Sequence, residues 1–204
     1  MKARRQKKEA MILNDKDQGS FLWRTAKNYW FLIPVVLGTF FLFHYVFFLG
    51  YVPSESMEPT LDIGSGVFAI RTEPGELHHG DVVIFDAPNG SNEIWIKRVI
   101  GLPGDEIAIR SDGVYRNGQK LSEEYVNPEE VPVYTEESYA VPAGKVFVMG
   151  DNRNHSNDSR FWDEPFLAEE DIDGKAILKF PVKPGCKSGV GLIVKQSKNI
   201  EICT

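Results

Sequence analysis

Two serines stand two residues apart in the segment PSESMEPTL (53–61), directly after a long apolar run. Ser54 or Ser56 could supply a nucleophilic hydroxyl, but a serine attacks a carbonyl only when a nearby base accepts its proton. The four histidines of the chain are scattered, and the adjacent His78 and His79 lie in a segment that has the composition of an exposed loop. A lysine is therefore the remaining candidate for the base.

Lys97 has the sequence surroundings that such a lysine requires. An ammonium group becomes a usable base only where burial lowers its pKa by several units. Lys97 lies in the apolar segment IWIKRVIG (94–101), and on an alternating strand it would share a face with Trp95 and Val99. After the apolar run, only Lys179 in AILKFPV has comparable neighbours. The alternative, which composition alone favours, is a lysine on the solvent face of a strand.

The third segment of interest is the polar cluster GDNRNHSNDSR (150–160), which directly follows the apolar segment KVFVM. A loop with so many donors and acceptors can brace itself through ion pairs and hold one hydroxyl in a fixed place. An ordinary polar loop is the alternative. Its charged and hydroxyl side chains are closely spaced: Asp151, Arg153, Ser156, Asp158, Ser159 and Arg160.

Several other chemistries lack their motifs. The chain has no G-x-S-x-G, Walker A, H-E-x-x-H or S-x-x-K sequence. GSGVFA (64–69) matches G-x-G-x-x-A but does not open a helix, so we expect no dinucleotide site there. Neither the spacing of Cys186 and Cys203 nor a nearby histidine indicates a metal site, so we expect no metal and no cofactor. A disulfide between these two cysteines stays open.

The charges are distributed unevenly along the chain. Residues 1–28 hold eight Lys/Arg and three acids, which gives a charge of +5. Because the net charge of the whole chain is -6, the remaining residues carry -11. An acidic domain is a poor binder of nucleic acid, and we expect no such partner. A basic N-terminal tail next to an apolar segment is typical of the cytoplasmic side of a membrane.

Residues 31–49, FLIPVVLGTFFLFHYVFFL, carry no formal charge. At about 1.5 Å per residue they would reach roughly 28 Å, close to the thickness of a hydrocarbon core. The interpretation is a single transmembrane anchor helix over 29–50, with a basic cytoplasmic tail (1–28) and an extracytoplasmic domain (51–204). A buried helix would show a polar face, and a cleaved signal peptide would be shorter and followed by a small-x-small site. His44 is interpreted as a tolerated polar side chain.

The rest of the chain indicates β-structure. Short β-branched or aromatic segments are separated by Gly, Pro, Asn and Asp, and SDG (111–113) and RNG (116–118) are hairpin signals. Residues 120–141 are acidic and poor in strand signals, which suggests a surface excursion, and GVGLIV (189–194) can finish the sheet. The expected strands lie in 66–71, 81–87, 93–101, 106–119, 145–150 and 175–180.

The segments PSESMEPTL, IKRVIGLPGDEI and GDNRNHSNDSR, in this order and together with GDVVIF (80–85) and the anchor, resemble the motifs of type I signal peptidases. These leader peptidases are membrane-bound serine proteases of peptidase family S26, and the likeness covers residues 30–180. It implies a mostly β fold, the antiparallel β-sheet catalytic domain shared with LexA-like self-cleaving repressors, after one transmembrane helix. It also implies a monomer at the cell membrane that contacts lipid and removes signal peptides from exported pre-proteins.

The resemblance assigns roles to individual residues. Ser56 would be the nucleophile and Lys97 the general base. The Ser54 hydroxyl and the Ser56 backbone N–H would form the oxyanion hole. Ser156 would hydrogen-bond the lysine amine. Val52 and Ile96 are assigned to a shallow apolar substrate-binding trough.

Two ion pairs and two departures complete this comparison. Asp158 with Arg160 matches the bracing ion pair of the family, and Asp151 with Arg98 is expected as a second pair. Glu55 stands where the family often has Gly, and we expect its side chain to point to solvent. Ser65 stands where the family tends to have Asp, which leaves the bracing of the local turn open.

Two further interpretations remain. The chain could be a dedicated processing peptidase for one exported or conjugation protein. It could also be a catalytically silent, membrane-anchored binding protein, although it retains Ser56, Lys97 and Ser156. A self-cleaving repressor would need a DNA-binding domain, which the first 50 residues do not supply.

Overall fold

The structure is a computed structural model, which describes residues 23, 27–91, 93–127, 136–182 and 191–192. The chain separates into two compact units, with the boundary between Tyr45 and Val46. Each unit is described by itself.

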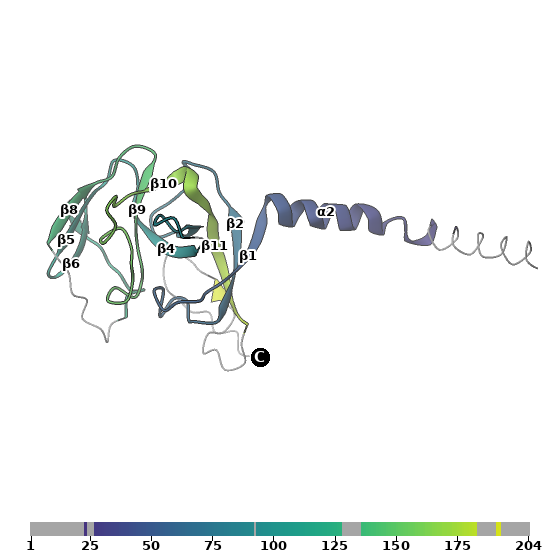
Figure 1. The fold of residues 1–204 in the computed structure, drawn as a ribbon, viewed down its shortest axis with the longest axis horizontal. Coiled ribbons are helices and arrows are strands. Elements are labelled where there is room, and N and C mark those ends of the chain that lie inside the picture. Colours follow the sequence, from purple (N-terminus) through teal and green to yellow (C-terminus); the bar gives the residue numbers. More distant parts are fainter. Residues whose placement is uncertain (1–22, 24–26, 92, 128–135, 183–190, 193–204) are drawn as a thin grey trace, which may run out of the picture. The chain divides into compact units, whose positions relative to one another are not determined.

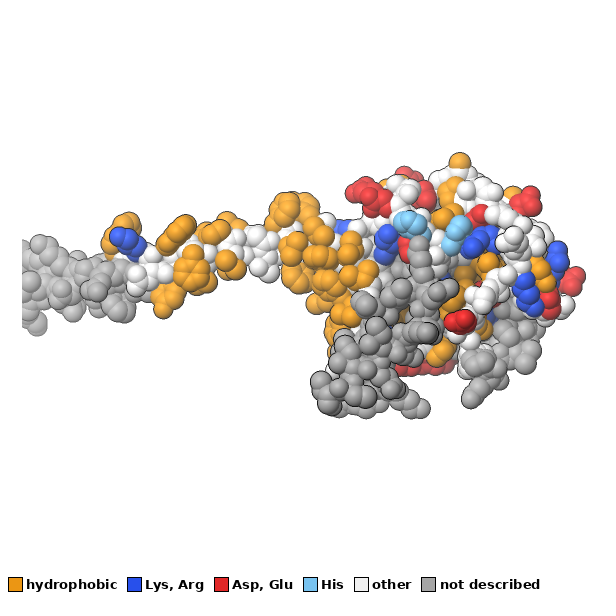
Figure 2. Space-filling view, turned by 180° about the vertical axis from the view of Figure 1, so that it is seen from behind, with side chains coloured by type: hydrophobic (Ala, Val, Ile, Leu, Met, Phe, Trp, Pro, Cys, Tyr) orange, Lys and Arg blue, Asp and Glu red, His pale blue; other side chains and the backbone are white. Residues whose placement is uncertain are grey.

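The first unit contains the helix α2 (Leu32–Tyr45), which has 14 residues and no buried side chain. Figure 2 shows apolar side chains along this unit. At about 1.5 Å per residue, α2 is roughly 21 Å long. Within the described part of the chain, no helix is long and apolar enough to cross a membrane.

The predicted anchor helix over 29–50 is wrong at its C-terminal end. The helix stops at Tyr45, and the last part of the apolar run forms the strand β1 (Phe47–Tyr51). β1 pairs antiparallel with β2 (Ser65–Arg71), and Phe47 lies opposite Ile70. A short apolar run rich in aromatic residues is compatible with both helix and strand. Here the pairing with β2 selects the strand.

The second unit is built on an antiparallel sheet, in which the strands are ordered β1-β2-β11-β3-β4-β9-β10 and β12 pairs with β11 (Figure 1). Each strand segment predicted from the sequence forms a strand. β4 lies between β3 and β9, at the interior of the sheet. The further bounds are β3 (Val82–Asp86), β4 (Ile94–Gly101), β9 (Lys145–Met149), β10 (Leu167–Ala168), β11 (Ile172–Pro181) and β12 (Gly191–Leu192), with the 3-10 turn η1 (Glu169–Asp171) between β10 and β11.

A second antiparallel sheet has the order β7-β6-β5-β8. Its strands are β5 (Glu106–Arg110), β6 (Gly113–Arg116), β7 (Gln119–Lys120) and β8 (Glu137–Ala140). The turn between β6 and β7 has positive φ at Asn117 and Gly118, as a tight two-residue hairpin requires. Both predicted hairpins are confirmed.

The interpretation of residues 120–141 as a strand-poor excursion is wrong for β8, which pairs with β5. This strand has one large residue, Tyr139, and its ring packs 4.7 Å from the ring of Phe147. One aromatic side chain in four residues is too little for a strand signal. The neighbouring strand and this packing contact supply the stabilisation instead.

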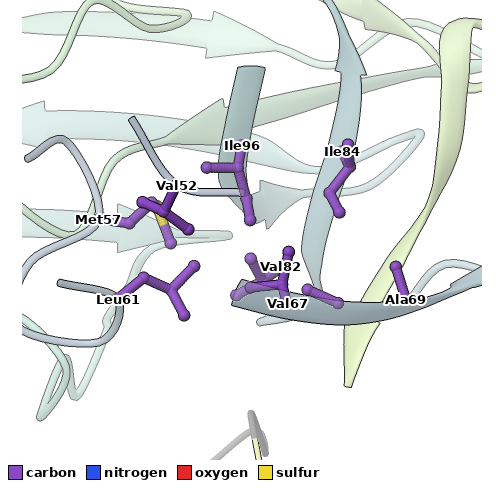
Figure 3. Packing of buried hydrophobic residues seen from close by; sticks show 9 residues of the cluster. Val52, Met57, Leu61, Val67, Ala69, Val82, Ile84 and Ile96 are labelled. Carbon is purple, nitrogen blue, oxygen red and sulfur yellow. The ribbon is translucent and has the colours of Figure 1, made fainter. Parts of the chain in front are cut away.

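One cluster of buried apolar side chains joins the polar segment after β1 to the sheet (Figure 3). Met57 and Leu61 come from that segment and have no exposed surface. The Leu61 N–H donates to the Met57 carbonyl at 2.8 Å. Ser56 is therefore attached to a residue that core packing holds in place. The cluster consists of Val52, Met57, Leu61, Val67, Ala69, Val82, Ile84, Ile96 and Ala176.

Candidate active site

Ser56 and Lys97 meet at the edge of this core. The connection from β1 to β2 carries Ser56, and it is closed at its base by the bond from the Gly64 N–H to the Val52 carbonyl at 2.9 Å. Lys97 lies in β4, where it is paired with Val83. The Lys97 Nζ lies 2.8 Å from Ser56 Oγ, and the two residues are 4% and 5% exposed. Two residues 41 positions apart thus form a buried hydrogen-bonded pair.

Burial determines the protonation of Lys97. Loss of hydration disfavours the ammonium form and lowers the pKa of Lys97 from 10.5 to about 8. The carboxylates of Asp158 and Asp151 favour the ammonium form and limit this fall. Lys97 Nζ also donates to the Ile96 carbonyl at 3.1 Å. The amine is therefore fixed in direction and can be neutral at a mildly alkaline pH, which a general base requires.

Two donors lie beside the nucleophile. Ser54 is exposed, and its hydroxyl lies 3.4 Å from Ser56 Oγ. Within the described residues, no group accepts a hydrogen bond from the Ser56 N–H. This arrangement is compatible with the predicted oxyanion hole, in which both groups would donate to a developing negative charge.

Glu55 fits between the two serines without backbone strain. Asn117 is the one non-glycine residue with positive φ among those described, so Glu55 is not in the left-handed region. Its side chain is 51% exposed and lies 3.4 Å from His155 Nδ1, which agrees with the expectation that it faces solvent. Glycine is therefore not needed at this position in this chain.

The expected hydrogen bond from Ser156 to the lysine amine is absent. Ser156 is buried, and its Oγ has no hydrogen-bond partner among the described residues. The hydroxyl lies against Gly150, where a Cβ would stand 2.2 Å from it. Lys97 Nζ donates instead to Ser56 Oγ and to the Ile96 carbonyl.

Both expected ion pairs form in the structure. Arg160 Nε donates to Asp158 Oδ1 at 2.8 Å, and Asp158 Oδ2 accepts the Gly150 N–H at 2.8 Å. Arg98 Nε donates to Asp151 Oδ1 at 2.7 Å. Asp151 therefore holds the segment 150–160 against β4, and Asp158 braces the segment internally. Both carboxylates are also the charges that act on Lys97.

Comparison with known proteins places the chain in a family. The family model described as "Signal peptidase, peptidase S26" matches residues 23–181, which is 159 of 204 residues. The chain belongs to the signal peptidase family, peptidase S26.

Individual signal peptidases are 30–40% identical to this chain. The protein described as "Probable signal peptidase I-1" from Synechocystis sp. is 40% identical over 141 residues, which cover 64% of this chain and 69% of that protein. Signal peptidase IB of Staphylococcus aureus is 34% identical over 168 residues, which cover 74% of this chain and 83% of that protein. A solved signal peptidase I from Enterococcus faecalis V583 is 30% identical, covers 50% of this chain and 98% of its own, and has a TM-score of 0.43.

In this signal peptidase, the two residues assigned to a substrate trough belong to the core. Val52 is 1% exposed and Ile96 is 8% exposed, and both pack in the cluster of Figure 3. The two side chains are almost fully covered, and their assignment to a shallow substrate trough stays a prediction. From Ile96 to Gly101, β4 is buried on both faces, so Ile96 and Lys97 are both covered although they point to opposite sides of the sheet.

The turn before β2 is braced despite the departure at Ser65. The Ser65 N–H donates to the Asp62 carbonyl at 3.1 Å, and the Ser65 carbonyl accepts the Val52 N–H at 2.9 Å. Backbone groups thus close the turn that an aspartate was expected to brace. The replacement of the family's Asp by Ser65 therefore does not leave this turn unbraced.

Sequence reasoning missed contacts that cross from the second sheet to the site. Arg153 forms a buried ion pair with Glu123, which Tyr125 also contacts through its hydroxyl at 2.9 Å. The guanidinium of Arg98 lies 4.1 Å from the centre of the Tyr125 ring. Glu123 and Tyr125 lie in the acidic segment interpreted as an excursion, and no local pattern marks them as partners of residues 27–30 positions away.

Cys186 and Cys203 lie outside the described residues. Among the residues that are described, no group of three or more His, Cys, Asp and Glu side chains could hold a metal ion.

Proposed function

We propose that this chain is a serine endopeptidase that uses a Ser56–Lys97 dyad to remove N-terminal signal peptides from exported pre-proteins. Membership of the signal peptidase family supports the reaction and the class of substrate. The 2.8 Å contact between Lys97 Nζ and Ser56 Oγ in a buried setting is the observation that carries the assignment of the dyad.

The proposed reaction begins with neutral Lys97. Its amine takes the proton of Ser56 as Oγ attacks the carbonyl carbon of the scissile bond. The negative oxygen that forms accepts hydrogen bonds from the Ser54 hydroxyl and the Ser56 N–H, and loss of one such donor costs about 3 kcal/mol of transition-state stabilisation.

The intermediate then collapses. The C–N bond breaks, and the Lys97 ammonium gives its proton to the leaving amine, which becomes the N-terminus of the mature protein. The signal peptide remains as an ester on Ser56. Lys97, neutral again, takes a proton from a water molecule that attacks this ester, and Ser56 recovers its proton as the ester bond breaks.

The substrate is proposed to bind extended, as a strand added to the edges of the site, with small side chains at positions -1 and -3. Because the exposed Ser54 and Glu55 leave the nucleophile segment accessible on one side, an extended chain can approach there. Profiling with several unrelated signal peptides separates a general peptidase from one dedicated to a single exported protein.

The N-terminal part is proposed to be a single-pass membrane anchor with its basic end in the cytoplasm. The apolar side chains of α2 are all unburied within its own unit, and residues 1–28 carry a charge of +5. Cytoplasmic positive charge favours this orientation. A protease added outside spheroplasts should digest the domain after Val46 and leave an N-terminal tag intact. A tag digested from outside would refute the orientation.

The decisive experiment replaces the dyad. Ser56→Ala and Lys97→Ala should each abolish cleavage of a pre-protein while circular dichroism and unfolding midpoint show a folded chain. His155→Ala should retain cleavage. If Lys97→Ala stayed active and His155→Ala did not, a Ser-His scheme would replace the dyad. A folded wild type that cleaves no pre-protein and takes no serine-directed label would indicate a silent binding protein.

A further inference from the structure

Asn152 joins the polar segment 150–160 to the nucleophile turn through two hydrogen bonds. Its backbone N–H donates to the Ser56 carbonyl at 3.1 Å, and its side-chain Nδ2 donates to the Glu55 carbonyl at 3.2 Å. The residue is 7% exposed. The two segments approach so closely that a Cβ at Gly150 would lie 2.5 Å from the Ser56 carbonyl oxygen.

These two bonds hold both peptide groups that flank the Ser56 Cα. The Glu55 carbonyl and the Ser56 N–H belong to the same planar peptide, and across a trans peptide they point in opposite directions. Whatever holds the Glu55 oxygen therefore also sets the direction of the Ser56 N–H. The Glu58 N–H contributes a second bond to the same oxygen at 3.0 Å. The bond to the Ser56 carbonyl fixes the following peptide.

We infer that Asn152 is a positioning residue that aims the Ser56 N–H at the oxyanion of the transition state. This inference rests on the proposed function, in which Ser56 is both nucleophile and oxyanion donor. A preorganised donor stabilises the transition state because it needs no reorientation when charge develops. Without the Asn152 amide, the Glu55–Ser56 peptide keeps one turn bond and gains freedom to tilt its N–H away.

The test compares three variants in the full chain. Asn152→Ala removes the amide, Asn152→Leu removes the donor but keeps the branched shape, and Asn157→Ala is the control. Asn157 is an exposed asparagine of the same loop. For each, kcat and KM are measured on a pre-protein peptide across pH, and kcat is corrected for the folded fraction given by tryptophan fluorescence.

Both Asn152 variants should lose roughly ten- to hundredfold in kcat, less than the 10²–10³ of a deleted donor. KM should stay within about twofold, because the donor acts mainly in the transition state. The pH midpoint of kcat should not move, since Lys97 keeps its surroundings. Asn157→Ala should match the wild type.

Three results would overturn the inference. The first is a kcat within about twofold of wild type in both Asn152 variants. The second is recovery by Asn152→Leu alone, which would make the role one of packing. The third is failure of both variants to fold, which would assign Asn152 to stability. Ser56→Ala in the same assay keeps the two questions apart, because residual activity there refutes the proposed function and not this inference alone.

Discussion

Replacing Lys97 by methionine should make the folded protein more stable at neutral pH while it abolishes cleavage. Methionine has a similar length and no charge, so it fits the apolar surroundings of β4. The wild type has to keep an amine in a site that disfavours its protonated form. The proposed base therefore imposes a cost on the fold, and this cost depends on pH.

The size of this cost follows from the lowered pKa of Lys97. A fall from 10.5 to about 8 corresponds, at about 1.4 kcal/mol per pH unit, to roughly 3 kcal/mol. Because the pKa is lower in the folded state, the unfolded chain binds more protons between these values, and the stability of the wild type rises with pH there. The cost is fully present below pH 8 and disappears as pH rises through 10.5.

Methionine also leaves Ser56 Oγ and the Ile96 carbonyl without the bonds that Lys97 makes, at about 1 kcal/mol each. The net gain at pH 7 is then about 1 kcal/mol. The change with pH is independent of these lost bonds. Between pH 7 and 9.5, the advantage of the Lys97→Met variant over the wild type should shrink by about 2 kcal/mol.

Urea unfolding of the full-length wild type and Lys97→Met variant, followed by tryptophan fluorescence at several pH values, measures this difference. Other titrating groups are common to both proteins and cancel. If the two free energies of unfolding stayed parallel from pH 7 to 9.5, the amine of Lys97 would not be held in a desolvated site, and the proposed base would lose its physical support.

Three further predictions concern the same site. First, kcat/KM should rise with pH and level off above about pH 8, because neutral Lys97 is the active form, whereas a midpoint near 6.5 would indicate a histidine. Second, Gly150→Ala should lower kcat at least tenfold and the free energy of unfolding by about 1–3 kcal/mol, since its Cβ would lie 2.5 Å from the carbonyl oxygen of the nucleophile; a urea midpoint and kcat equal to wild type would contradict this close approach. Third, Glu123→Ala should destabilise the fold by about 3 kcal/mol in urea unfolding, because it removes the carboxylate that pairs with the buried Arg153 guanidinium; the exposed Glu124→Ala is the control, and equal effects of the two would refute the role of the pair.

The strands that position the dyad could be predicted because their signals are local. The segment around Lys97 is apolar on both sides of the adjacent charges Lys97 and Arg98, and a short apolar run of this kind favours a strand. Ser56 could be assigned because it belongs to one of three motifs in a fixed order. Neither assignment required knowledge of which segments lie side by side.

The end of the anchor helix could not be predicted, because the deciding partner is distant in sequence. Phe47–Leu49 are as apolar as the residues of α2, and only the pairing of β1 with β2 selects the extended form. The same limit applies to Asn152 and Glu123. Each acts through a bond to a residue 30 or more positions away, and neither carries a local feature that distinguishes it from other polar residues.

The pKa of Lys97 is a balance that the surrounding loop determines. Burial alone would lower this pKa further, and the nearby carboxylates of Asp158 and Asp151 counteract it. Asp151 also attaches the loop to Arg98 of β4, and Asp158 pairs with Arg160 inside the loop. Because the same ion pairs hold the loop and set the field at the amine, a change that loosens the loop must also change the protonation of the base. Stability of this loop and the pH range of activity are therefore coupled, and neither can be altered at these residues without the other.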